Sequence, residues 1–261
     1  MRIPGSCMRL TLKQSLGVLR PARCITQSRS KITLATLLTF LVLCVTASAE
    51  VLISRYVVNL DGLRVGDATL RTDLDSKRYK VEISADVGLF LVSTQIKGEA
   101  SGARSDVKLT PEHFQITMSG GDEEAIEFDF ANSAEAAADG AVRLRGVFDP
   151  LSALLVASLK PSSASNHLCD TVLPIFTGRD RFDLNLRPKP AGSAQSEPAL
   201  IRCEATLSQL LTGGTQPRKL DWEIAFIKAA TPQFWLVERI SLPTANGIVT
   251  IDRAETSFSG H

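Results

Sequence analysis

Hydrophobic and polar residues alternate along much of the chain after residue 50, the pattern of β-strands with one buried face. In Tyr79–Val87 the odd positions are apolar and the even positions are polar or charged. The segments Ile126–Phe130 and Arg181–Leu186 alternate in the same way. Successive side chains of a strand point to opposite faces, so each segment places one face in a core and the other in water.

Two glycine-containing pairs predict tight hairpins between such segments. Asp61-Gly62 separates Val51–Leu60 from Leu63–Leu74. Asn246-Gly247 separates Phe234–Leu242 from Ile248–Arg253. Both pairs accept the positive φ that a tight turn requires, so each predicts two antiparallel neighbours.

One helix is predicted from Asp149 onward. The Asp149 carboxylate can cap free N–H groups of the first turn, and Pro150 fits that turn because its missing donor is not needed there. The leucines that follow are expected to share one face: Leu151, Leu154, Leu155 and Leu159. We expect this helix to plug the end of a sheet, with Ser152 as a surface or packing residue.

Roughly ten or eleven short strands and one helix, without alternation of the two, predict a mainly β fold. An antiparallel sheet of this size must curl, close or stack to bury its apolar face. We therefore expect one strongly curved antiparallel sheet or an open β-barrel with one short helix. A β-sandwich is the alternative.

The first 49 residues have a different composition, with seven Lys or Arg and no Asp or Glu. An uncharged run of 14 residues, Ile32–Val45, is followed by Ala47-Ser48-Ala49. A basic region, a short apolar run and a small-residue site are the parts of a secretory signal. A spanning helix needs about 20 apolar residues, so we expect 1–49 to be a cleaved signal peptide with an extended basic region. A mitochondrial presequence and a lipoprotein signal at Cys44 are the weaker alternatives.

Residues 50–261 are then expected to form a single β-rich periplasmic domain that does not span the membrane. The leader holds 7 of the 29 Lys and Arg and none of the 28 Asp and Glu, so 22 basic residues face 28 acidic ones and the net charge becomes −6. A mildly acidic domain lacks the clustered basic residues that nucleic acid requires, so no nucleic-acid partner is predicted.

Two cysteines remain after the leader, Cys169 and Cys203. If the strand-like segments Arg181–Leu186 and Ala199–Leu207 pair as a hairpin, the two thiols come within bridging distance. We expect a structural disulfide. A redox-active or metal-binding pair is the alternative, although both prefer closer spacing or added ligands.

Residues with catalytic or metal-binding chemistry are sparse. His113, His167 and His261 have no metal-ligand partner at the usual spacing, and we find no nucleophile elbow, phosphate loop or zinc-protease motif. No catalytic residue, metal or cofactor is predicted. An enzyme site assembled from scattered carboxylates is the alternative, because pairs close only in space leave no trace in the sequence.

Two segments are candidates for ligand binding. In Gly178–Asp183 a glycine turn leads into a charged strand: Arg179 and Arg181 are the candidate ligand-binding cations, and Gly178, Phe182 and Asp183 are expected to be structural. A hairpin laced with cross-strand ion pairs is the favoured interpretation. The second segment is the apolar run Leu89, Phe90, Leu91 and Val92, which is either core or the lining of an apolar groove for an acyl chain.

The order of these landmarks resembles the bacterial envelope family known as domain of unknown function 3108. The residues that carry the resemblance are Tyr56–Ala68, Gly88-Leu89, Asp149–Leu155, Cys169-Asp170, Phe176–Asp183 and Pro198–Cys203. The middle motifs resemble its alphaproteobacterial branch. In place of the Gly-His pair common in that branch, this chain has Thr212-Gly213-Gly214. The resemblance implies an exported β-rich fold and no established activity.

These observations favour an envelope-associated periplasmic protein without enzymatic activity. We expect it to bind a hydrophobic or lipidic component, an envelope polymer, or a protein partner on its curved sheet. A periplasmic hydrolase is the alternative.

Overall fold

The structure, a computed structural model, describes residues 50–89, 92–120, 123–130, 146–159, 168–189, 200–209, 219–229 and 234–260. The chain divides into two units, Met1–Thr46 and Ala47–His261. All described residues belong to the second unit, so the predicted signal peptide lies outside them.

Twelve strands form one antiparallel sheet in the order β6-β5-β4-β3-β2-β1-β12-β11-β10-β9-β8-β7. Its strands are β1 (Glu50–Leu60), β2 (Leu63–Leu74), β3 (Arg78–Leu89), β4 (Val92–Ser105), β5 (Lys108–Ser119), β6 (Glu124–Asp129), β7 (Thr171–Phe176), β8 (Arg181–Pro188), β9 (Leu200–Gln209), β10 (Lys219–Lys228), β11 (Trp235–Thr244) and β12 (Gly247–Gly260). Within the described part of the chain one short helix, α3 (Pro150–Ser158), accompanies them. The sheet is not closed, and β6 and β7 are its edges. The predicted curved, open sheet is confirmed.

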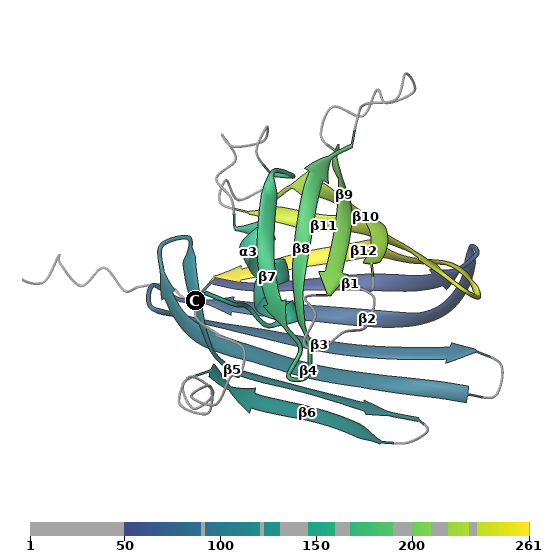
Figure 1. The fold of residues 1–261 in the computed structure, drawn as a ribbon, viewed down its shortest axis with the longest axis horizontal. Coiled ribbons are helices and arrows are strands. Elements are labelled where there is room, and N and C mark those ends of the chain that lie inside the picture. The colour runs from purple at the N-terminus through teal and green to yellow at the C-terminus, as the bar shows by residue number, and fades with distance from the viewer. Residues whose placement is uncertain are drawn as a thin grey trace, which may run out of the picture. The chain divides into compact units, whose positions relative to one another are not determined.

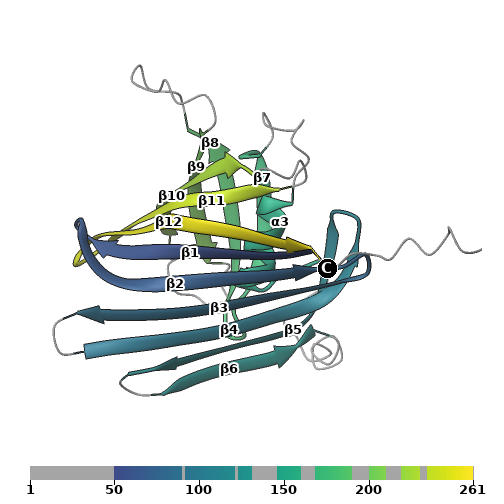
Figure 2. The same cartoon turned by 180° about the vertical axis from the view of Figure 1, so that it is seen from behind.

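The sheet curls so that its two halves face each other. Strands β7, β8 and β9 stand steeply across β1–β4 (Figure 1), and the view from behind shows α3 between the two halves (Figure 2). The curl depends on β11 and β12, which pair only between Arg239–Thr244 and Gly247–Asp252 although both strands continue further. Beyond that point β11 stays with β10 and β12 stays with β1, so the sheet folds there.

Helix α3 is buried on two opposite sides. Leu151, Leu155 and Leu159 pack against one cluster of buried side chains, which includes Val81 and Phe114 of the first half. Ala153 and Ala157 pack against a second cluster from β7–β11, which includes Leu184, Ile224 and Phe226. A helix that is apolar all round is stable only when it is enclosed. The expected single leucine face is therefore wrong, because Leu154 joins the second cluster.

The two predicted hairpins are present. Asp61 and Gly62 have φ of 49° and 82°, the pair of positive values that a tight two-residue turn requires. The second hairpin turns at Ala245-Asn246, and Gly247, with φ of 127°, is the first residue of β12. The predicted turn is thus one residue earlier than the Asn-Gly pair indicates.

Candidate functional site

The inner face of β1–β6 carries rows of apolar side chains that α3 covers at only one end. Residues paired across antiparallel strands share a face, so the register defines each row. Val81, Ala100 and Phe114 form a row next to α3, and all three are buried. Both views show the strands of this half running well past the helix (Figures 1 and 2).

Two further rows lie beyond the covered one. Ala68 is buried, and the other seven residues are half-buried, so their aliphatic surfaces remain partly accessible. We call these eight residues the open inner face: Leu70, Ile83, Ile116 and Ile126 in the nearer row, and Ala68, Ala85, Ile96 and Met118 in the next.

A polar group borders the open inner face where β11 and β12 separate. Arg253 lies opposite Tyr56 in the register of β12 and β1. Its Nε donates to Glu238 Oε2 at 2.8 Å, and the two side chains are 20% and 31% exposed. Burial raises the pKa of Tyr56 to about 12, so its phenol is neutral at physiological pH. Since Arg253 and Glu238 neutralise each other, this border adds no net charge to the inner face.

Three buried hydroxyl and carboxyl groups join α3 to the sheet. The hydroxyls of Tyr79 and Ser152 lie 2.7 Å apart, and the Ser152 hydroxyl donates to Asp149 Oδ2 at 2.5 Å. Asp149 also caps the helix, since its Oδ1 accepts from the Ser152 N–H at 2.8 Å. Burial raises the pKa of the Asp149 carboxyl. Asp149 and Ser152 are fully enclosed and Tyr79 is 2% exposed, so this group is an anchor out of reach of a substrate.

The turn between β7 and β8 rests on the opposite edge strand, β6. The Phe128 and Phe176 rings meet edge to face at a centroid distance of 5.0 Å. Gly178 has φ of 88°, and a Cβ there would overlap the Ile126 side chain. Arg179 Nη1 lies 2.7 Å from Glu124 Oε1. We call this contact the clasp, formed by Phe176, Gly178 and Arg179 on one side and Glu124, Ile126 and Phe128 on the other.

The clasp accounts for the positions of Gly178 and Arg179 in the segment Gly178–Asp183, which the sequence singles out. Arg179 was expected to form an ion pair within its own hairpin. It instead pairs with Glu124 of β6. Arg181 begins β8 opposite Phe176. Phe182 packs against the second core cluster, and Asp183 pairs with Pro174 and Ser208 in the register.

The apolar run that starts at Leu89 includes the last residue of β3, Leu89, and the first residue of β4, Val92. Leu89 and Val92 are the last paired residues of the two strands. Phe90, Leu91 and the side chains at 89 and 92 lie outside the described residues. Their proposed role in lining an apolar groove stays a prediction.

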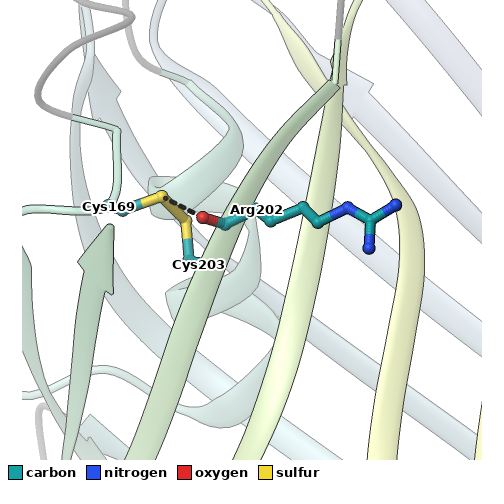
Figure 3. The surroundings of a disulfide bond; sticks show 3 residues. All are labelled: Cys169, Arg202 and Cys203. Atoms are coloured by element: carbon teal, nitrogen blue, oxygen red, sulfur yellow. Dashed lines mark hydrogen bonds between the residues drawn. A yellow bond between two sulfur atoms is a disulfide. The ribbon is translucent and has the colours of Figure 1, made fainter. Parts of the chain in front are cut away.

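The structure brings Cys169 and Cys203 together, which fits the predicted disulfide (Figure 3). Their Cα atoms are 5.3 Å apart, and the bond joins the segment before β7 to β9. Strand β8 lies between, and Pro188 pairs with Cys203. The Sγ of Cys169 also contacts the carbonyl oxygen of Arg202 at 3.5 Å. Both cysteines lie within the second core cluster, so the bond fastens the β7–β9 half of the sheet.

The outer face of the sheet is polar. Its described residues line open depressions of about 590 Å³ over β2–β5 and about 730 Å³ over β8–β12. Ion pairs cross the first one, among them Arg71 with Glu82 and Lys80 with Glu99. Such exposed networks are typical of a solvated sheet face, so the apolar candidate surface is the inner one.

The described residues include neither a metal-binding cluster nor a membrane-spanning helix. No cluster of three His, Cys, Asp or Glu side chains placed to hold a metal occurs in the described ranges. His113 instead approaches Asp129, with Nδ1 and Oδ1 2.7 Å apart, and His167 and His261 lie outside those ranges. None of the described helical residues belongs to a helix long and apolar enough to cross a membrane.

Sequence patterns predicted only part of the open inner face: Ile83, Ala85 and Ile126 lie in alternating segments, whereas the other five residues were not singled out. In β4, Ile96 and Ala100 alternate with charged residues, but Gly98 and Gly102 interrupt the apolar positions. The bond between Tyr79 and Ser152 joins residues 73 positions apart, and nothing local indicates it.

The fold defines a class of protein in which one open, curled antiparallel sheet surrounds a buried helix. Within that class, the chain belongs to the family described as Protein of unknown function (DUF3108), whose model matches residues 55–193. This match confirms the resemblance seen in the sequence. It covers most of β1, β2–β8 and α3 and ends before Cys203. No curated protein shows a significant match to the chain.

Proposed function

We propose that this chain is an exported, non-catalytic binding protein of the bacterial envelope that holds the acyl chain of a lipid. The observation that carries the proposal is the open inner face, where seven of eight neighbouring apolar residues keep part of their surface accessible inside a curled sheet. Apolar surface gathered on a concave face is typical of a binding site.

The shape and composition of the open inner face favour an acyl chain. Ala68 and Ala85 are paired neighbours at the β2–β3 end of its further row, and Ile96 and Met118 continue the row. Small residues between larger ones leave room for a narrow, flexible ligand. Each buried methylene contributes about 0.8 kcal/mol, so an acyl chain with ten methylenes in contact gains roughly 8 kcal/mol before the entropy of ordering is subtracted.

The proposed compartment rests on the leader and the cysteine pair. Residues 1–49 have the three parts of a secretory signal. A structural disulfide persists in oxidising compartments and is rare in the cytosol. Together they support export to the periplasm.

The non-catalytic part of the proposal rests on where reactive groups lie. The open inner face consists of aliphatic side chains, and the bordering Arg253 and Glu238 bind each other. The Asp149 carboxyl, the kind of group with raised pKa that a hydrolase would use, is enclosed at the end of α3.

A matched pair of substitutions on β3 tests the proposal. Ala85 faces inward and its neighbour Ser84 faces outward and is exposed. We expect Ala85→Trp to weaken binding of the fluorescent fatty acid cis-parinaric acid by about 10-fold or more, because the indole projects onto the open inner face and occupies the space of the acyl chain. Ser84→Trp should leave binding unchanged. Equal binding by both variants and the wild type would place the ligand elsewhere.

A further inference from the structure

The two edge strands of the sheet, β6 and β7, cannot pair through backbone hydrogen bonds. On its free side β7 is already occupied by Phe148, whose N–H donates to the Pro174 carbonyl and whose carbonyl accepts from the Phe176 N–H, both at 2.8 Å. Pro174 itself has no N–H to offer. The facing edge strand, β6, carries Glu127 and Asp129, and charges on an edge strand oppose pairing with another strand.

The contacts described between the two edges are those of the clasp, and these are weak enough to open. The Arg179–Glu124 pair is largely in solvent, with side chains 65% and 39% exposed. An ion pair of that kind contributes little to stability. The contact between the Phe128 and Phe176 rings adds only a modest stabilisation. None of these contacts is a ladder of backbone hydrogen bonds, so the clasp can open without unpairing a strand.

The clasp also lies directly against the open inner face. Ile126 belongs to both, since it sits beneath Gly178 and is the last member of the row that continues through Ile116 to Ile83. Lifting the β7–β8 turn away from β6 would expose Ile126 and would widen access to the rest of that row, which is already partly accessible. The clasp therefore covers the end of the proposed acyl site that lies nearest the gap between the two edges.

We propose that the clasp is a closable entrance, through which an acyl chain enters sideways between β6 and β7 and reaches the open inner face. This inference rests on the proposed function. It also gives Gly178 a role. Because Gly178 has no Cβ, the β7–β8 turn packs closely against Ile126, and moving this turn alone breaks the contact.

Bridging the clasp covalently tests the entrance. In a double variant, Glu124→Cys with Arg179→Cys, the two thiols are joined by a short bis-maleimide, while Cys169 and Cys203 are held in their disulfide. The control is Arg78→Cys with Glu112→Cys. That native pair is also 2.7 Å apart and similarly exposed, at 60% and 43%, but it lies within the β3–β5 half of the sheet. The full-length gene is expressed, and the protein is purified as the host processes it.

The measured quantities are the association and release rates of cis-parinaric acid. Before bridging, loss of the Arg179–Glu124 pair should raise both rates roughly 2- to 5-fold over wild type. Bridging should slow both by roughly tenfold or more. Bridging the control pair should leave both rates unchanged.

The outcomes separate the two proposals. If probe binds but its rates do not respond to bridging of the clasp, the entrance lies elsewhere and the acyl site stands. If bridging slows the clasp variant and the control alike, the effect is general rigidity and the entrance is contradicted. If wild type does not bind the probe in any form, the proposed function fails and the entrance fails with it.

Discussion

The hydroxyl groups of Tyr79 and Ser152 lie 2.7 Å apart and join β3 to the only helix of the described chain. The contact is possible because β4 carries Gly102 at this point, where a Cβ would come within 2.9 Å of the Tyr79 hydroxyl oxygen. The Ser152 hydroxyl donates a hydrogen bond to Asp149, so one hydrogen-bonded chain runs from β3 to the helix N-terminus. We infer that this chain fixes how α3 sits on the first half of the sheet.

Removal of the Tyr79 hydroxyl should destabilise the protein. We expect Tyr79→Phe to lower the free energy of unfolding by about 1 kcal/mol, the usual contribution of one buried hydrogen bond. Ser152→Ala should cost somewhat more because it also leaves the Tyr79 hydroxyl and one Asp149 oxygen without their partner. Urea unfolding of both single variants and the double variant gives a coupling energy, expected at about 0.5 kcal/mol or above. Additive effects would show that the two hydroxyls do not interact.

Asp149 should make stability depend on pH. Burial raises the pKa of its carboxyl from 3.8, so the folded protein keeps this proton to a higher pH than the unfolded chain does. Between the two pKa values the folded state binds more protons, and the free energy of unfolding falls as the pH rises. Asp149→Asn keeps an oxygen for the helix cap and has no charge. Relative to this variant, wild type should lose stability as the pH rises from about 3.8 upward.

The control for that experiment is Asp149→Ala, which removes both the charge and the cap. Relative to Asp149→Asn, it should lower the free energy of unfolding by about 1–2 kcal/mol at every pH, because the Ser152 N–H loses its acceptor. A wild-type curve parallel to that of Asp149→Asn between pH 3 and pH 7 would contradict the raised pKa.

The bond between Cys169 and Cys203 should be a large contributor to stability. It closes a loop with a sequence separation of 34, for which chain entropy gives roughly 3–4 kcal/mol. Cys169→Ala with Cys203→Ala should lower the free energy of unfolding by about that amount, and reduction of wild type with dithiothreitol should do the same. Equal stability of oxidised and reduced protein would exclude a structural role.

Alanine substitutions at Gly178 and Gly62 distinguish the cost of backbone strain from the cost of steric overlap. Both have positive φ, 88° and 82°, but a Cβ at 62 meets nothing within 4 Å, whereas one at 178 overlaps Ile126. Gly62→Ala should therefore cost only the left-handed conformation, about 1 kcal/mol. Gly178→Ala should cost that amount plus about 1 kcal/mol or more for the overlap. Similar thermal shifts for the two variants would indicate that the clasp is loose.

The sequence predicted the sheet well because alternation is a local signal. Strands such as β3 and β8 have one apolar and one polar face, and turns such as Asp61-Gly62 fix which strands are neighbours. The cap at Asp149 is local too, since donor and acceptor are three residues apart.

The arrangement of the candidate site depends on contacts that leave no local pattern. The clasp joins Arg179 to Glu124 across the whole width of the sheet. The two-sided burial of α3 follows from the curl, and the curl follows from the place where β11 and β12 separate. Long-range geometry of this kind is set by how the finished sheet bends.

The most direct test of the central claim is native mass spectrometry of the protein purified from the envelope of the cells that make it. The proposed function predicts an added mass that matches a lipid, released by organic solvent and largely absent from the Ala85→Trp variant but retained by Ser84→Trp. A clean, unliganded mass for wild type, together with no uptake of cis-parinaric acid, would contradict it.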